Sequence, residues 1–421
     1  MAALADGPPG FSLAGDSGML RVGTPADAID GVVPQVVAEP QTPEALAAFL
    51  RWCNGERLRV IIRGSGTKLG WGQRSSSVDV ILGTARLTRV LAHADGDLTA
   101  TVEAGARVRD FNASLAGHRQ WLPVNPAFEA ATIGGTIATN DSGSLRHRHG
   151  TIRDLLIGMH LATTDGLLVK SGGNVVKNVA GYDLGRLMCG SQGGLAAIVS
   201  ATFKLAPRPT GSATLIVDCP DRRTLSLAAA AVGDSQLEPV AFDLHVARGT
   251  ATRSRLLVQF ATATQAIVEQ IAQARALVAG AGTAAVLAGD EEADAWAHAG
   301  GAVWSPGGLV VRLSWLRSSL PDLVALVEDL GRSAVAMQLV GRVAVGAGFL
   351  RLDADAHVQA AAIERLCRAD VVGNVAVLRA DAGVERRDRT SEPSVEGARL
   401  LREIKRAFDP NGTLVAGVEM G

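Results

Sequence analysis

The chain has 421 residues, of which 47% are hydrophobic and 20% are charged, and its formal net charge is −1. This balance is typical of a folded globular protein, and the length accommodates two or three domains. The near-zero charge disfavours nucleic acid as the main partner, because phosphate binding requires a basic surface.

The four cysteines, Cys53, Cys189, Cys219 and Cys367, lie too far apart in the sequence for a metal-binding or redox motif. We therefore expect reduced thiols and a cytoplasmic location. No apolar run approaches the roughly 18 residues of a membrane span, which leaves peripheral association open. Residues 1–30 lack the basic start and apolar core of a signal peptide, and we expect them to form a loose leader.

Residues 31–210 are predicted to form one domain with two subdomains, at about 31–93 and 94–210. Near its start, Thr42 can cap a helix that has Pro43 in its first turn. The apolar run at residues 60–62 predicts a buried strand that leads directly into the loop "RGSGTKLG". Further along, residues 155–170 predict a hairpin that turns at Asp165-Gly166.

The loop "RGSGTKLG" is not a standard nucleotide-binding fingerprint. Leu69 stands where a dinucleotide motif requires its third glycine, and the chain has no Gly-Lys pair for a phosphate loop. Successive small residues after a strand could still form an anion-binding concavity, with a simple tight turn as the alternative. A second small-residue segment, "TIGGTIATNDSG" at 132–143, could lie flat against a planar ring. A third glycine-rich segment lies at residues 171–205, and three such segments within about 140 residues favour a ligand over isolated turns.

After the Pro-rich break at 206–211, strand and helix patterns alternate in two loosely repeated series. They predict a second domain at 211–395, with α+β (ferredoxin-like) architecture on an antiparallel sheet, as a cap or substrate domain. Residues 396–421 form a predicted helix that ends at "DPNG", and we expect this segment to return to the first domain.

Four motifs in this order resemble FAD-linked oxidases of the vanillyl-alcohol oxidase type: "RGSGTKLG", "ATIGGTIATNDSG…GTIRDLLIG", "GGNVVKNVAGYDLGRLMCGS" and "FDPNG". The third is most similar to the FAD-binding subunit of bacterial glycolate oxidase. The resemblance covers roughly residues 40–209 and the tail, about half of the chain. It implies an α+β fold in which a two-subdomain, PCMH-type FAD-binding domain is joined to the second domain.

The resemblance also implies which residues would contact FAD. The pyrophosphate is expected at Arg63, Gly64, Ser65, Gly66 and Thr67. The flavin ring is expected beside Thr132, Ile133, Gly134, Gly135, Ala138, Thr139, Asn140, Ser142, Gly143, Gly150, Thr151 and Asp154. The ribose and adenine are expected beside Gly190, Ala197 and Ile198. Thr67 stands where some relatives carry a histidine that tethers the flavin, so the bound FAD is expected to be non-covalent.

Oxidation of a hydroxy acid requires a base near the hydroxyl and a cation for the carboxylate. The weak candidates are His149 in a His- and Arg-rich loop, Tyr182 beside the third motif, and the strand residues Arg312 and Arg342. The alternative for His149 is a solvated loop, and for Tyr182 it is a structural role beside FAD. The two arginines could simply face water. His357 is the lone histidine where relatives carry a metal motif, so no metal is expected.

These features predict the FAD-binding subunit of a 2-hydroxy acid oxidoreductase of the glycolate or lactate type. Its partners would be a second FAD-binding catalytic subunit and an iron–sulfur subunit. One alternative is a self-sufficient FAD-dependent alcohol or sugar oxidase, and another is a structural subunit without catalytic flavin. Flavin content and the activity of the isolated chain distinguish these possibilities, whereas the substrate, electron acceptor and oligomeric state stay open.

Overall fold

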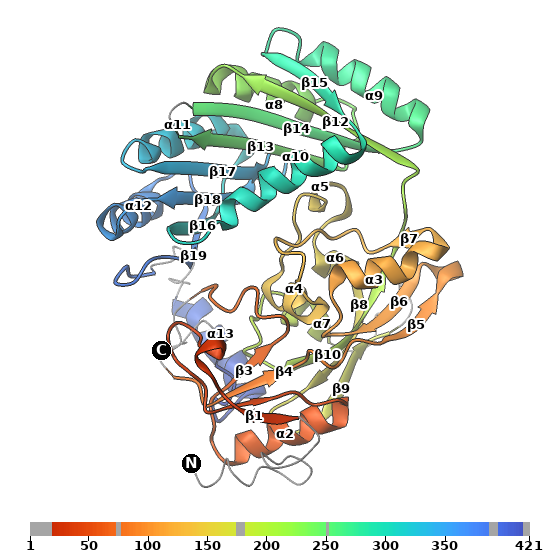
Figure 1. Cartoon of the computed structure of the whole chain (residues 1–421), viewed down its shortest axis with the longest axis vertical. Helices are drawn as coiled ribbons and strands as arrows, with labels where there is room; N and C mark the ends of the chain where they lie inside the picture. The colour runs from red at the N-terminus through yellow and green to blue at the C-terminus, as the bar shows by residue number, and fades with distance from the viewer. Residues whose placement is uncertain (1–18, 73–76, 174–181, 250–251, 387–394, 416–421) are drawn as a thin grey trace. The chain divides into compact units, whose positions relative to one another are not determined.

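The computed structural model describes residues 19–72, 77–173, 182–249, 252–386 and 395–415 (Figure 1). Its contacts divide the chain into two compact units. Unit 1 comprises residues 1–143, 150–208 and 394–421, and unit 2 comprises 144–149 and 209–393. The division therefore falls after residues 208 and 393, where the sequence predicted boundaries after 210 and 395. The short segment Ser144–His149, between two predicted flavin-wall motifs, belongs to unit 2.

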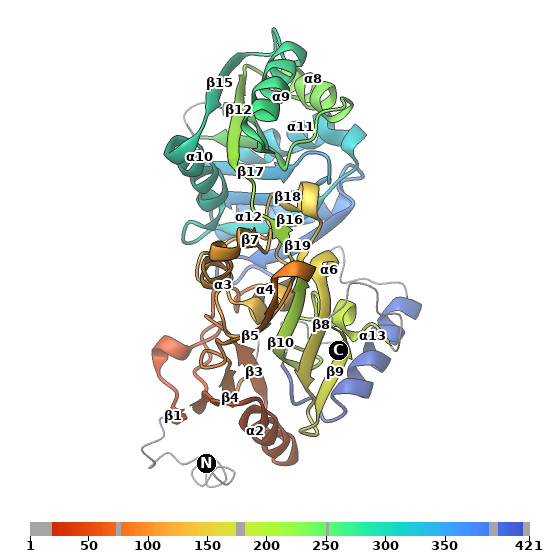
Figure 2. The same cartoon turned by 90° about the vertical axis from the view of Figure 1, so that its right-hand side faces the viewer.

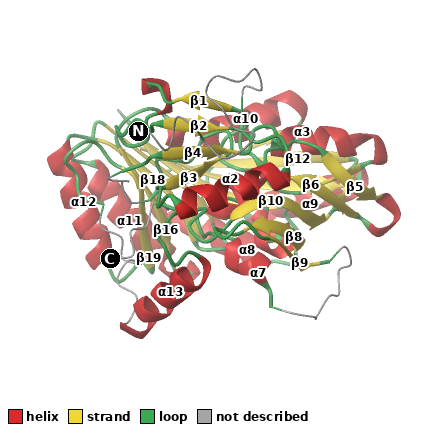
Figure 3. Cartoon of the chain, turned by 90° about the horizontal axis from the view of Figure 1, so that it is seen from below, coloured by secondary structure: helices red, strands yellow, loops and turns green. Residues whose placement is uncertain are grey.

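The first sheet of unit 1 has the strand order β1-β2-β4-β3. Its strands are β1 (Leu20–Val22), β2 (Val36–Ala38), β3 (Val60–Arg63) and β4 (Val80–Gly83). Helix α2 (Pro43–Gly55) begins after Thr42, whose side chain accepts the Ala45 N–H, and its apolar side packs on one face of this sheet (Figure 3). Residues 19–30 are not part of a loose leader, because β1 pairs with β2 and the short helix η1 (Pro25–Asp27) follows it.

The second sheet of unit 1 is antiparallel, with the order β5-β6-β10-β8-β9. Its strands are β5 (Val90–Ala94), β6 (Thr99–Glu103), β8 (Leu156–Ala162), β9 (Leu168–Gly172) and β10 (Ala197–Lys204). Strands β8 and β9 form the predicted hairpin around Asp165-Gly166. Strand β5 already belongs to this sheet, so the predicted subdomain boundary after residue 93 lies too late.

Short elements connect the strands of unit 1. They are α3 (Val108–Leu115), β7 (Gln120–Trp121), α4 (Ile133–Thr139), α6 (Ile152–Leu155), α7 (Leu184–Met188) and β11 (Ala206–Pro207). Helices α3, α4 and α6 contribute Phe111, Ile137 and Ile152 to the core beneath the second sheet. This packing fixes α4, the helix that forms within the second glycine-rich segment.

The C-terminal helix α13 (Val395–Phe408) lies beside the second sheet of unit 1 (Figure 2). Lys405 donates from Nζ to the carbonyls of Gly194 and Leu414, and it pairs with the buried Asp409 at 2.6 Å. Leu414 then forms a parallel bridge with Val60 at the start of β3. The "DPNG" turn is therefore attached to the strand that leads into the first glycine loop.

Unit 2 is built on one eight-stranded antiparallel sheet with the order β15-β12-β14-β13-β17-β18-β16-β19. The first half contains β12 (Gly211–Cys219), α8 (Arg222–Gly233), β13 (Ala241–Arg248), β14 (Thr252–Thr262), α9 (Thr264–Leu277) and β15 (Thr283–Leu287). The second half contains β16 (Leu309–Ser314), α11 (Leu320–Gly331), β17 (Ala336–Arg342), β18 (Ala347–Asp353), α12 (Ala356–Arg368) and β19 (Asn374–Arg379). Each half is a ferredoxin-like β-α-β-β-α-β motif, and the halves join where β13 pairs with β17, which confirms the predicted α+β architecture.

The two faces of this sheet differ because successive side chains on a strand point to opposite sides. Helices α8, α9, α11 and α12 cover an apolar face that includes Leu215, Phe242 and Leu350 (Figure 1). The opposite face contacts α10 (Gly289–Gly301) through Ala299 and carries many polar side chains. This polar face also contacts the short helix α5 (Arg146–His149) at β13.

Within the described ranges, no helix is both long and apolar enough to span a bilayer. The same ranges hold no cluster of three or more His, Cys, Asp or Glu residues that could bind a metal ion.

Candidate functional site

The first glycine loop of unit 1 and helix α4 form one pocket. The loop follows β3, and α4 begins after Thr132, whose Oγ1 accepts the Gly135 N–H at 3.2 Å. A Cβ atom on Gly64 would lie only 2.2 Å from Thr132 Oγ1, so the loop and the helix approach this closely only because residue 64 is glycine. The pocket is lined by Ile61, Ile62, Gly64, Ser65, Gly66, Thr67, Lys68, Leu69, Trp71, Thr132, Gly135, Ala138, Thr139, Gln192 and Val415.

This pocket fits a cofactor with an anionic group and a flat ring. Gly66 and Gly135 both line the pocket, and a Cβ atom on Gly135 would meet only Thr132 Oγ1 among the described residues, at 3.1 Å. Close by, the buried atoms Asn140 Oδ1 and Ser191 Oγ have no hydrogen-bond partner among the described residues. Buried polar atoms normally have partners, and a bound ligand could supply these.

Other predicted contacts serve internal packing in this structure. A Cβ atom on Gly134 would lie 2.9 Å from the Ala104 Cβ, and one on Gly143 would lie 1.9 Å from the Asn125 carbonyl oxygen. Gly134 is therefore required by the packing of α4 against Ala104, and the pocket is lined by its neighbour Gly135. The remaining predicted ring, ribose and adenine contacts lie outside the pocket lining, and their roles stay predictions: Ile133, Asn140, Ser142, Gly150, Thr151, Asp154, Gly190, Ala197 and Ile198.

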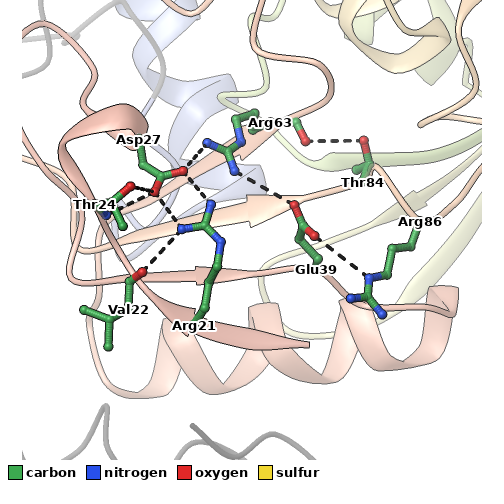
Figure 4. A network of polar contacts seen from close by, with 8 residues as sticks. All are labelled: Arg21, Val22, Thr24, Asp27, Glu39, Arg63, Thr84 and Arg86. Atoms are coloured by element: carbon green, nitrogen blue, oxygen red, sulfur yellow. Dashed lines mark hydrogen bonds and ion pairs between the residues drawn. The ribbon is translucent and has the colours of Figure 1, made fainter. Parts of the chain in front are cut away.

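The side chain of Arg63 lies in a network of ion pairs at the base of the loop (Figure 4). Its guanidinium pairs with Asp27 at 2.9 Å and approaches Glu39 at 3.9 Å. Arg21 also pairs with Asp27, and together these contacts hold the pKa of Asp27 well below its usual range. The Arg63 guanidinium, predicted as a pyrophosphate contact, is thus already neutralised by carboxylates.

We expect Asp27→Asn to lower the free energy of unfolding by about 2–3 kcal/mol at pH 7, because it breaks charged hydrogen bonds to Arg21 and Arg63. Asp27 has a depressed folded-state pKa, so its contribution is present above the unfolded value of about 3.9 and is lost on acidification through the folded value. Denaturant unfolding at several pH values measures this difference. The exposed Asp97→Asn is the matched control, and a gap between wild type and Asp27→Asn that widens below pH 4 would contradict the assignment.

In unit 2, the predicted residues Arg312 and Arg342 share the polar face of the sheet. Val340 and Arg312 both lie opposite Phe349, so all three are on one face. Arg342 is two residues from Val340 on the same strand, and its guanidinium lies 5.1 Å from the centroid of the Phe349 ring. The two arginines therefore flank one aromatic ring.

A buried acid accompanies Arg342. Asp243 lies directly opposite it on β13, with Arg342 Nε 3.8 Å from Asp243 Oδ2, and the same oxygen accepts the Ser144 hydroxyl at 2.5 Å. Burial raises the pKa of Asp243 above its usual value. Within the described part of unit 2, buried polar atoms without a hydrogen-bond partner on this face are Asp243 Oδ1, His245 Nε2, Gln338 Oε1, Arg342 Nε, Arg351 Nε and Asn374 Oδ1.

The remaining catalytic candidates are separated. His149 lies in α5 of unit 2, where burial and Arg148 lower its pKa. Tyr182 belongs to unit 1 and is 92% exposed, and its expected role beside FAD stays a prediction. Residues 174–181, which precede it in the third motif, lie outside the described residues. Burial lowers the pKa of His245 to about 4, which keeps that ring neutral.

Sequence reasoning missed Lys68, Asp141 and Asp243. Lys68 follows the glycine loop, and its ion pair with Asp141 joins the first two small-residue motifs. The position of Lys68 directly after a loop of small residues could have identified it from the sequence. Its partner Asp141, 73 positions later, gave no such indication. Asp243 alternates with Phe242 and Leu244 in "FDLHVAR", and this alternation places it on the polar face with His245.

Comparison with known proteins supports a flavin site. Residues 34–172 match the FAD binding domain family. The D-lactate dehydrogenase of Archaeoglobus fulgidus is 32% identical over 44% of this chain and 42% of its own length. The glycolate oxidase subunit GlcD of Bacillus subtilis is 32% identical over 44% of this chain and 39% of its own length. The chain thus matches about two fifths of these relatives.

A structure of alkyldihydroxyacetonephosphate synthase covers 98% of this chain and 86% of its own, with a TM-score of 0.72 and 14% identity. This likeness confirms the predicted fold class. The family match confirms FAD as the predicted cofactor, and the matched residues belong to unit 1 except for 144–149.

Proposed function

We propose that this chain, whose residues 34–172 form an FAD-binding domain, is the FAD-carrying subunit of a 2-hydroxy acid oxidoreductase. The observation that carries the proposal is the pocket formed by the glycine loop and α4 inside that domain. Relatives named for D-lactate, glycolate and D-2-hydroxyglutarate support the substrate class, since all three are 2-hydroxy acids.

The residues of unit 1 would bind FAD through backbone rather than through a covalent tether. The N–H groups of Ser65, Gly66 and Thr67 suit the pyrophosphate, because fixed backbone donors need little reorganisation around an anion. Gly135 and Thr139 offer a small-residue surface for the ring. When bound, FAD supplies a two-electron acceptor, and Thr67 leaves it non-covalent.

The polar face of unit 2 would bind the carboxylate of the substrate. Arg342 and Arg312 are cations on one face, and a guanidinium pairs with a carboxylate through two parallel hydrogen bonds. Asp243 holds Arg342 in place and lowers the cost of burying its charge. The partnerless polar atoms on this face support a polar ligand over a simple structural role.

The partners belong to the same proposal. A relative is named as a glycolate oxidase subunit, and this chain would likewise act with a second FAD-binding catalytic subunit and an iron–sulfur subunit. The described cysteines are all free, which suits the cytoplasmic location expected from their spacing. The alternatives stay a self-sufficient alcohol or sugar oxidase and a structural subunit.

The first test is the flavin content of the purified protein. We expect a yellow protein from which acid precipitation releases FAD into the supernatant, because Thr67 cannot form the tether. The absorption spectra of the pellet and supernatant measure this. Flavin retained in the pellet would refute non-covalent binding, and a colourless protein that takes up no added FAD would refute the cofactor assignment and favour a structural subunit.

A further inference from the structure

Lys68 is a buried cation in the wall of the FAD pocket. It follows the glycine loop directly, and only 4% of its side chain is exposed. Its Nζ lies 3.0 Å from Asp141 Oδ2 and 5.5 Å from the centroid of the Trp71 ring. Burial lowers the pKa of Lys68, and the carboxylate of Asp141 opposes that change. Removing an ammonium group from water costs several kcal/mol unless a partner offsets the loss, so the buried position of Lys68 requires an explanation.

Asp141 is oriented independently of Lys68. The same Oδ2 atom accepts the Ala127 N–H at 2.9 Å, and only 2% of the Asp141 side chain is exposed. An ammonium has three donors, and Asp141 is its hydrogen-bonding carboxylate among the described residues. Lys68 therefore retains donor capacity beside the pocket that it lines.

The charges around the pocket indicate which ligand group the free donors of Lys68 would bind. Among the described residues that line the pocket, Lys68 is the charged one. The guanidinium of Arg63, at the start of the same loop, is already paired with Asp27 and approaches Glu39. The pyrophosphate of FAD carries two negative charges, and backbone N–H groups contribute only partial charges toward it.

We infer that Lys68 donates a charged hydrogen bond to the pyrophosphate of bound FAD, and that Asp141 is the positioning residue that holds Lys68 there. The inference rests on the proposed function, since it requires FAD in this pocket. It explains why the chain places a lysine at a buried position directly after the glycine loop. It also explains why the second small-residue motif contains an aspartate, Asp141, that reaches back to the first.

The test compares Lys68→Met with wild type in the full chain. Methionine keeps a long apolar side chain and removes the charge, so we expect the Kd for FAD to rise about 10- to 100-fold. The Kd for riboflavin, which lacks phosphate, should change less than threefold. Titrations of flavin-free protein with both ligands, followed by protein and flavin fluorescence, measure the two constants. Thermal unfolding of the flavin-free proteins reports any loss of folding.

Asp141→Asn and the double variant Lys68→Met/Asp141→Asn complete the set. Asp141→Asn should weaken FAD binding less than Lys68→Met does, since the ammonium stays but loses its anchor. The double variant leaves no unpaired buried charge, so it carries the test if Lys68→Met alone fails to fold.

Two outcomes would overturn the inference. One is an unchanged Kd for FAD in Lys68→Met, whether or not the flavin midpoint potential shifts, and the other is an equal loss of affinity for FAD and riboflavin. Each leaves the proposed function standing, provided that the wild type binds FAD. Failure of the wild type to bind FAD would instead refute the proposed function.

Discussion

Gly135→Val is expected to raise the Kd for FAD by at least about 100-fold while leaving the flavin-free fold nearly intact. Its new side chain would point into space where, among the atoms of the described residues, only Thr132 Oγ1 lies within 4 Å of the Cβ position, at 3.1 Å. Gly135 lines the pocket, so the branched side chain would occupy volume that the cofactor needs. Small shifts of the surrounding structure relieve such overpacking only in part, so the valine side chain is expected to exclude the cofactor.

The neighbouring glycine provides the matched control. Gly134→Val would push its side chain against Ala104, with the Cβ atoms 2.9 Å apart before the branches are added. This overpacking should cost about 1–3 kcal/mol of stability, while the folded fraction still binds FAD. Thermal unfolding with and without excess FAD, together with FAD titration, separates the two variants. Normal FAD affinity in Gly135→Val would show that α4 does not face the cofactor.

This pair of glycines shows where sequence reasoning reached its limit. The family resemblance implied that both Gly134 and Gly135 touch the cofactor, because a motif does not show which side of a short helix faces a ligand. In the structure, Ala104 on the chain after β6 occupies one side of α4, and the pocket lies on the other. That assignment depends on a contact between residues 30 positions apart, which local spacing does not encode.

The domain architecture was more accessible from the sequence, because it depends on local periodicity. Alternation in strands such as "AFDLHVAR" and the amphipathic helices between them predicted an antiparallel α+β domain. The pairing of β13 with β17, which fuses the two halves, was not predictable, since either edge strand could have paired elsewhere. Arg342 was therefore named from sequence without Asp243, its partner across that junction.

The N-terminal segment illustrates a different failure. The lack of a basic start and an apolar core suggested a loose leader over residues 1–30, yet Asp27 is buried and pairs with Arg21 and Arg63. Arg63, one partner of Asp27, belongs to the first glycine motif. Because the sequence analysis assigned Arg63 to the cofactor, it assigned no role to Asp27. Long-range ion pairs of this kind follow from the fold and not from composition.

The isolated chain, loaded with FAD, is expected not to oxidise glycolate or D-lactate at a useful rate. Arg342 and Arg312 can provide the cation for a carboxylate, but we find no strong base for the hydroxyl proton beside them among the described residues. Asp243 is buried and already hydrogen-bonded to Ser144. Burial lowers the pKa of His245, on the same face, to about 4, and it also lowers the pKa of His149 in the neighbouring helix α5, so both imidazoles are weak bases. Loss of a positioned base typically costs about 10²–10⁴-fold in rate.

The measurement is anaerobic addition of glycolate or D-lactate to the FAD-loaded chain, with the flavin absorbance followed over time. Chemical reduction with dithionite is the control, because it must bleach the same flavin and so prove that the cofactor is competent. Rapid bleaching by either hydroxy acid would contradict the expectation and would assign the base to this chain. Asp243→Asn would then be the decisive variant, because the Asp243 carboxylate lies beside Arg342 in the proposed carboxylate site. An asparagine amide there could still accept the Ser144 hydrogen bond, but it could not take up the substrate proton.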